Sequence, residues 1–222
     1  MARSSEVLER KYVKVMGPTL GLLYSRLWAE CTHLHMTWGE YVVLFGTSEE
    51  NVDLLNRAAP AFTKMIQDAL WENVLMHLCR LVDSRSTLGK ENLTILRLPE
   101  LVSGSLKMEV EQAISDVLKS CDFAKDWRNR RISHSDLDLN TGASSLPLAV
   151  ASRAKVREAL KELCKVLNLV ERHYTNSEVM YDFIEPRGGS KSLLFVLKSG
   201  IKAEAGRRER LMKGCPEPDD FK

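Results

Sequence analysis

The hydrophobic positions of this chain follow the spacing of amphipathic helices along most of its length. Apolar residues recur three or four positions apart near residues 8–15, 20–38, 66–81, 110–121, 156–174 and 193–201. A helix with one buried face produces this period, whereas a half-buried strand alternates at every second residue. The pattern therefore predicts about five to seven helices and little or no sheet.

Residues that start or interrupt helices divide this pattern. Pro18 suits the first turn of a helix, where the missing N–H of proline would be unpaired anyway, and Pro60 kinks or restarts the helix that begins near Ser48. Ser48, followed by two acidic residues, is a typical helix start. Three polar stretches, at 84–106, 136–147 and 175–190, break the pattern. The first of them contains residues 92–98, which alternate like a strand but have no obvious partner, so we expect a loop with local extended structure there.

Composition adds a fold class to these helices. The chain has 222 residues, of which 44% are hydrophobic and 28% charged, as in an ordinary soluble domain. Short connections between long amphipathic helices favour an antiparallel helical bundle. We predict an all-α bundle that forms a single domain over residues 1–213, followed by a disordered tail, 214–222, that contains two prolines.

Charge and cysteine usage limit the functional classes. The 32 basic and 30 acidic side chains give a net charge of +2, which argues against a protein that coats polyanions in general. Five cysteines without a Cys-x-x-Cys pair argue against a disulfide scaffold or zinc finger, and most lie in apolar helical patterns as small hydrophobes. With no secretion signal or membrane-spanning stretch in sight, we expect a cytoplasmic protein that makes no membrane contact.

Two segments have the composition of a binding site but can also be explained without a ligand. Cys31-Thr32-His33-Leu34-His35 has metal-ligand residue types, but helix residues two apart point about 200° apart. We expect a core cysteine with two satisfied or exposed histidines, and neither a metal nor a cofactor. Residues 187–213 carry eight basic and two acidic side chains. Such a run is usually a solvated helix face, and the alternative is a surface that faces a polyphosphate.

The segment from Lys125 to His134 has the more unusual composition. Four basic residues (Lys125, Arg128, Arg130 and Arg131) surround Trp127 and precede His134. An arginine can bind a phosphate through two parallel hydrogen bonds and stabilise the charge of the transition state. A histidine can transfer protons near neutral pH, so the pair could cleave a phosphodiester without a metal. The alternative is a basic helix end with a surface histidine.

The run Arg128-Asn129-Arg130-Arg131-Ile132-Ser133-His134 resembles the signature of the HEPN superfamily, in which an arginine and a polar residue precede a histidine. Its surroundings, with Asp126-Trp127 before it and Ser135-Asp136 after it, resemble the abortive-infection (AbiU-like) branch. Segments 80–83 and 91–95 also resemble parts of that branch. The resemblance covers roughly residues 20–174.

The resemblance implies a fold and a function. It implies a HEPN-like four-helix core with extra helices, and a metal-independent endoribonuclease of phage defence or of a toxin–antitoxin system. By position, Arg128 would bind the phosphate, His134 would transfer the proton and Asn129 would orient them or the ribose. Arg130 and Arg131 have no fixed role, and we expect them to bind the RNA backbone. The implied partners are an RNA substrate, a second copy of the chain in a homodimer and an antitoxin protein.

Helix geometry leaves the arrangement of this motif open. In an ideal helix, positions 128 and 134 lie about 120° apart and about 9 Å along the axis. Either Arg128 reaches around, the helix deforms, or the two residues act from different subunits. Asp136 occupies the position at which one toxin branch has a tyrosine that its antitoxin modifies, so that form of control is not expected. A non-catalytic module that binds RNA, a nucleotide or a partner protein is the alternative function, and a structural bundle in a larger complex is a third.

Overall fold

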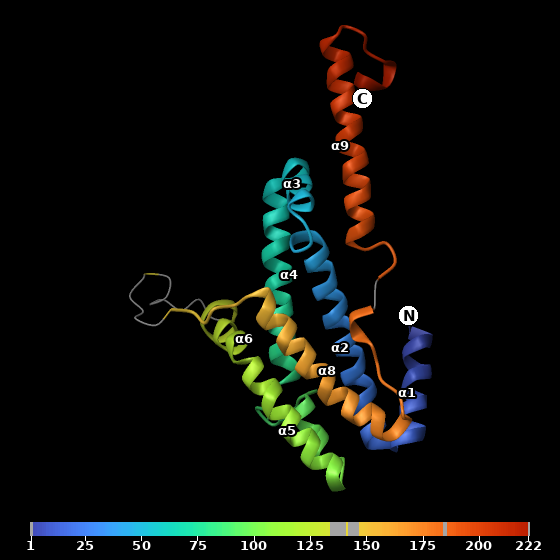
Figure 1. The fold of residues 1–222 in the computed structure, drawn as a ribbon, viewed down its shortest axis with the longest axis vertical. Coiled ribbons are helices and arrows are strands. Elements are labelled where there is room, and N and C mark those ends of the chain that lie inside the picture. The colour runs from blue at the N-terminus through green and yellow to red at the C-terminus, as the bar shows by residue number, and fades with distance from the viewer. Residues whose placement is uncertain (1, 134–140, 142–146, 184–185, 222) are drawn as a thin grey trace. The chain divides into compact units, whose positions relative to one another are not determined.

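The structure is a computed structural model that describes residues 2–133, 141, 147–183 and 186–221, and it confirms an all-α helical bundle. The α-helices are α1 (Ala2–Met16), α2 (Pro18–Phe45), α3 (Glu49–Ala58), α4 (Pro60–Leu81), α5 (Gly104–Ser120), α6 (Asp122–Trp127), α8 (Arg153–Thr175) and α9 (Ser190–Met212) (Figure 1). Shorter turns of helix are η1 (Ile95–Glu100), η2 (Arg128–Ile132), η3 (Tyr181–Phe183) and η4 (Pro218–Phe221). Among the described residues, no helix combines the length and apolarity that crossing a membrane requires.

Local signals set several of these boundaries. The hydroxyl of Ser48 accepts a hydrogen bond from the backbone N–H of Asn51 and caps α3, as its position in the sequence predicts. Pro60 is the first residue of α4, so the chain becomes helical again at this proline after α3 ends at Ala58. Ser152 caps α8 through the N–H of Lys155. These boundaries follow from side chains next to them in the chain.

The first polar break contains a small hairpin. Strands β1 (Ser86–Thr87) and β2 (Lys90–Glu91) pair antiparallel, with Ser86 opposite Glu91 and Thr87 opposite Lys90. Leu88 and Gly89 form the turn between them, with φ angles of 49° and 77°. Two consecutive residues with positive φ match the twist of the flanking strands, which makes the tight turn possible.

The extended structure expected at residues 92–98 is wrong for most of that segment, because it becomes the 3-10 helix η1. Thr94 caps this helix by accepting from the N–H of Leu96, and its own hydroxyl donates to the carbonyl of Leu81 at 3.0 Å. Ile95 and Leu98 are both buried. They lie three residues apart, which is one turn of a 3-10 helix, and so they share its buried face.

The chain divides into two compact units, and the boundary between them falls within α2 and α4. Unit 1 contains residues 1–37 and 72–184, and unit 2 contains residues 38–71 and 185–222. The single domain expected over residues 1–213 stays a prediction.

Unit 1 holds most of the buried apolar side chains. Helices α5 and α8 lie side by side (Figure 1). The fully buried side chains of α2, α4 and α8 include Tyr24, Leu27, Leu34, Val74, Leu75, Leu78, Leu163 and Leu167. The hydroxyl of Tyr24 donates to the carbonyl of Leu167 at 3.1 Å and so joins α2 to α8. This core positions both clusters of polar residues that are described below.

Unit 2 is built from the end of α2, α3, the start of α4 and α9. The rings of Trp38 and Tyr41 stack at 5.4 Å, and the ring of Trp71 lies 5.5 Å from that of Tyr41. The Glu40 carboxylate accepts hydrogen bonds from both the backbone N–H and the hydroxyl of Ser190. A carboxylate at this position stabilises α9, because the first N–H groups of a helix have no partner within it.

The segment 214–222, for which a disordered tail stays a prediction, contains the 3-10 turn η4 at Pro218–Phe221. Asp220 in η4 accepts hydrogen bonds from the Arg210 guanidinium and from the N–H of Glu217. Arg207 also donates to the carbonyl of Asp220 at 2.8 Å. The arginines of α9 thus hold the residues that follow the helix.

Candidate active site at the end of α6

The motif segment begins with a deformed turn of helix. Helix α6 leads into η2, a π-helical turn in which the N–H of Ser133 donates to the carbonyl of Arg128 at 2.8 Å. This hydrogen bond spans five residues, one more than in an α-helix. Single π turns inside helices occur frequently at functional sites. The helix is therefore deformed between Arg128 and Ser133, whereas the way in which Arg128 and His134 come together stays a prediction, because His134 lies outside the described residues.

The guanidinium of Arg128 is held by two acceptors. Its Nη1 donates to Oδ1 of Asp83 at 2.6 Å, and its Nε donates to Oδ1 of Asn129 at 3.0 Å. Asp83 follows the end of α4, 45 residues before Arg128 in the chain. The hydrogen bond to Asp83 raises the pKa of Arg128, so the guanidinium stays charged at any physiological pH.

These two contacts leave much of the guanidinium free to bind an anion. An arginine has five N–H donors, and those on Nη2 and one on Nη1 have no hydrogen-bond partner within the described part of the chain. The side chain is 24% exposed. Arg128 is therefore oriented by the fold and still accessible, as binding of a phosphate oxygen requires.

The other two arginines of the motif have different partners. Nη1 of Arg130 lies 3.6 Å from Oδ1 of Asp126 and donates to the carbonyl of Pro147 at 3.3 Å. The guanidinium of Arg131 lies 5.5 Å from the centre of the Trp127 ring, within the range of a cation–π contact. Binding of the RNA backbone by these arginines stays a prediction.

Two hydrogen bonds join α6 to the segment that precedes α8. The indole N–H of Trp127 donates to the carbonyl of Ala149 at 2.8 Å, and the N–H of Ala149 donates to the Asp126 carboxylate at 2.7 Å. Together with the contact of Arg130, they fix residues 147–149 beside the motif. Residues 147–149, although they follow the motif by more than a dozen positions, therefore lie next to it.

The structure brings together only some of the residues that the sequence singled out. Arg128 and Asn129 are in direct contact, and Arg130 and Arg131 occupy the same turn. His134 lies outside the described residues, as does Asp136. The assignment of His134 as the proton-transfer residue therefore stays a prediction.

Asp83 is not among the site residues that the sequence predicts. Asp83 belongs to the segment 80–83 that resembles the abortive-infection branch, so that resemblance was the available signal. Nothing in its local pattern relates Asp83 to Arg128, because their contact depends on how α4 and α6 pack. Asp126, which precedes Trp127, likewise belongs to a segment that resembles the abortive-infection branch.

The candidate metal ligands between Cys31 and His35 have different neighbours in the structure. Cys31 is fully buried, as expected of a core cysteine, and the ring of His33 lies 5.7 Å from that of His77 in α4. His35 is buried beside Cys164, a residue that the sequence pattern does not connect with it. The Sγ of Cys164, in α8, lies 3.1 Å from Nε2 of His35.

The helical bundle and the run that begins with Arg128 and Asn129 at the end of α6 fit the resemblance to the HEPN superfamily. The comparison with protein families agrees, since residues 18–192 match the model of AbiU2, a HEPN family, and the chain belongs to this family. Neither the curated proteins nor the solved structures include a match to the chain.

Proposed function

We propose that this protein is a metal-independent endoribonuclease of the HEPN type that acts in phage defence or in a toxin–antitoxin system. The observation that carries the proposal is the guanidinium of Arg128, which is oriented by Asp83 and Asn129 and still offers N–H donors to an anion. The membership of the AbiU2 family adds support.

The proposed reaction uses the 2′-hydroxyl of the RNA as the nucleophile. This oxygen attacks the adjacent phosphorus, the bond from phosphorus to the 5′-oxygen breaks, and the products carry a 2′,3′-cyclic phosphate and a 5′-hydroxyl. Arg128 binds the phosphate oxygens and stabilises the charge that develops on them. His134 takes the proton from the 2′-hydroxyl or gives one to the leaving 5′-oxygen. Asn129 orients Arg128 through the hydrogen bond to Nε.

The test is cleavage of tRNA and total RNA by the full chain in the presence of EDTA. We expect cleavage by the native protein and a loss of about 10²–10³-fold or more in both Arg128→Ala and His134→Ala. Arg172→Ala is the matched control, because Arg172 is also a surface arginine paired with a carboxylate, that of Glu178. Circular dichroism in the same buffer verifies that helix content is retained.

Two results would contradict the proposal. Equal cleavage by the native protein and the two motif variants would point to a contaminating nuclease. Retention of RNA without any turnover, unchanged in His134→Ala, would favour the non-catalytic binding module instead. End-group analysis of the products adds a further check, since a 3′-phosphate or 3′-hydroxyl formed directly would exclude attack by the 2′-hydroxyl.

We further propose that the protein acts as a homodimer in which the two motif segments share one cleft. Light scattering at micromolar concentration measures the oligomeric state, and a strict monomer would contradict this part. A mixture of Arg128→Ala and His134→Ala chains tests whether the residues act across the interface. Recovered cleavage in the mixture is expected if arginine and histidine come from different subunits, because one composite site then keeps both.

A further inference from the structure

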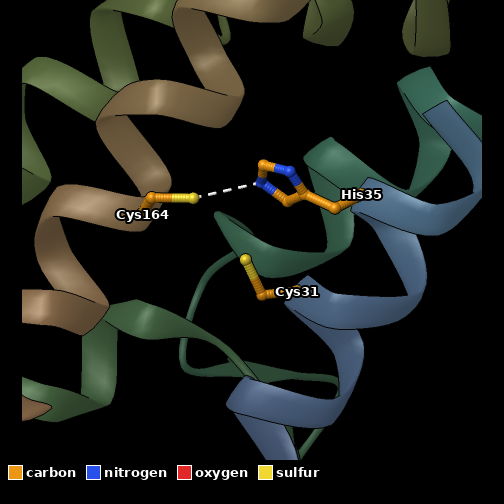
Figure 2. Close-up of side chains that lie close together, drawn as sticks. All are labelled: Cys31, His35 and Cys164. Atoms are coloured by element: carbon orange, nitrogen blue, oxygen red, sulfur yellow. Dashed lines mark hydrogen bonds between the residues drawn. The ribbon is translucent and has the colours of Figure 1, made fainter. Parts of the chain in front are cut away.

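The second polar cluster of unit 1 lies between α2 and α8, and it consists of Cys31, His35 and Cys164 (Figure 2). Cys31 and His35 are four residues apart on α2, so they project from the same face of the helix. Cys164 faces them from α8, and the three possible ligand atoms all lie within 4.8 Å of one another. Cys31 and His35 are buried and Cys164 is half-buried.

A carboxylate fixes the orientation of the histidine in this cluster. Oδ1 of Asp182, in η3, lies 3.1 Å from Nδ1 of His35. A proton on Nδ1 is donated to this carboxylate, which leaves the lone pair of Nε2 on the side of the two sulfur atoms. Histidines that bind metals are commonly held by a carboxylate in this way, because the contact fixes both tautomer and ring orientation.

The types and spacing of these groups match one class of cation. In a tetrahedral zinc site, metal–sulfur bonds of about 2.3 Å and metal–nitrogen bonds of about 2.0 Å place the ligand atoms about 3.5–3.8 Å apart. The ligand atoms of the cluster lie within 4.8 Å of one another, so shifts of about 1 Å bring them to these separations. Two thiolates and an imidazole suit Zn²⁺, whereas Mg²⁺ and Ca²⁺ require oxygen ligands.

We propose that Cys31, His35 and Cys164 bind one Zn²⁺ ion, with Asp182 as the residue that positions His35. This departs from the metal-free protein expected from the sequence, which considered residues two apart and did not connect Cys164 with them. Both cysteines lose their protons on binding, and the ion joins α2 to α8.

Three protein ligands leave one position of the tetrahedron for water or another small ligand. Tyr181 packs against His35, with 5.4 Å between ring centres, and its hydroxyl is buried without a hydrogen-bond partner among the described residues. The Tyr181 ring therefore lines the cluster next to His35.

The test is a titration of the reduced, chelator-stripped full chain with Co²⁺ as a spectroscopic substitute, followed by displacement with Zn²⁺. We expect one Co²⁺ per chain, with thiolate-to-cobalt charge-transfer absorption and the visible bands of tetrahedral cobalt. Cys31→Ser and Cys164→Ser should each lower Zn²⁺ affinity and weaken the charge-transfer band. Cys215→Ser is the matched control, because Cys215 is exposed and lies in unit 2.

Asp182→Asn separates positioning from ligation. The Asp182 side chain is 86% exposed, so the substitution should leave the fold intact. We expect the tetrahedral cobalt spectrum to remain while Zn²⁺ affinity falls by about 10–100-fold. If Cys31→Ser fails to fold, the half-buried Cys164 and the exposed Asp182 still provide the test.

The proposal would be overturned if cobalt gave no thiolate charge transfer, or if the band were the same in Cys31→Ser and Cys164→Ser as in the native chain. A Cys31–Cys164 disulfide in the isolated protein, with no metal binding after its reduction, would also overturn it. These readouts measure metal binding directly, so they succeed or fail independently of RNA cleavage and of Arg128.

Discussion

Two arginine-rich segments of this chain look alike in sequence and differ in structure. One is the motif turn η2 in unit 1, and the other is the end of α9 in unit 2. In α9, Arg207 and Arg208 pair with Glu204 three and four residues earlier, and Arg210 pairs with Asp220 ten residues later. In η2, the carboxylate that binds Arg128 comes from Asp83, 45 residues earlier.

The difference shows what distinguishes a positioned cation from a solvated one. Ion pairs between side chains on neighbouring turns form wherever an exposed helix carries both charges, and each contributes little to the free energy of unfolding. They favour the interpretation of residues 187–213 as a solvated helix face. The contact between Asp83 and Arg128 requires two separate elements to pack in one way, and it leaves part of the guanidinium available.

The largest effect is expected when the carboxylates of Asp83 and Glu204, which pair with arginines in the two segments, are replaced in turn. Asp83→Asn removes the charge that orients Arg128, and we expect the rate of RNA cleavage to fall about fivefold, as loss of about 1 kcal/mol of a part-exposed ionic hydrogen bond predicts. Glu204→Gln in α9 should change the rate by less than about twofold, because surface substitutions away from the site have small effects. Single-turnover kinetics measures both. Faster cleavage by Asp83→Asn would instead mean that Asp83 blocks Arg128.

The pH dependence of the α9 pairs provides the next test. Hydrogen bonds, chiefly from Arg210, lower the pKa of Asp220 from 3.8 to about 2. Because the folded-state pKa is depressed, the stabilisation is fully present above the unfolded value and is lost as the pH falls through about 2. Hydrogen exchange of residues 207–221 should therefore show η4 protected at pH 5 and released near pH 2. Asp220→Asn should abolish this change, and equal protection at both pH values would contradict the assignment.

The smallest effect is expected from Arg208→Ala. This arginine is 75% exposed and pairs only with Glu204 on its own helix among the described residues. We expect the midpoint of thermal unfolding to change by about 1–2 °C at most, and RNA cleavage to be unaffected. A loss of RNA binding in Arg208→Ala would show that this face of α9 contacts a polyphosphate, which is the alternative raised by its charge.

The sequence predicts the helices well where the deciding residues are neighbours in the chain. Ser48 and Pro60 mark the boundaries of α3 and α4, and the apolar stripe from Val156 to Tyr174 becomes α8. Residues 193–201 predict only part of α9, because beyond Ile201 the helix is supported by arginine–glutamate pairs rather than by an apolar stripe. Residues 92–98 alternate as in a strand, but Ile95 and Leu98 are both buried, and a 3-10 helix places residues three apart on one face whereas a strand does not.

By itself, the sequence determined the helical class, the helix starts at Pro18, Ser48 and Pro60, and the motif from Arg128 onward, because periodicity, caps and contiguous motifs are properties of neighbouring residues. The tertiary structure alone decided that Asp83 binds Arg128 and that Cys164 meets His35, 129 residues away. The physical reason is that such contacts depend on the register in which helices pack. Many registers bury the same apolar stripe, and only the packed molecule selects which polar side chains meet.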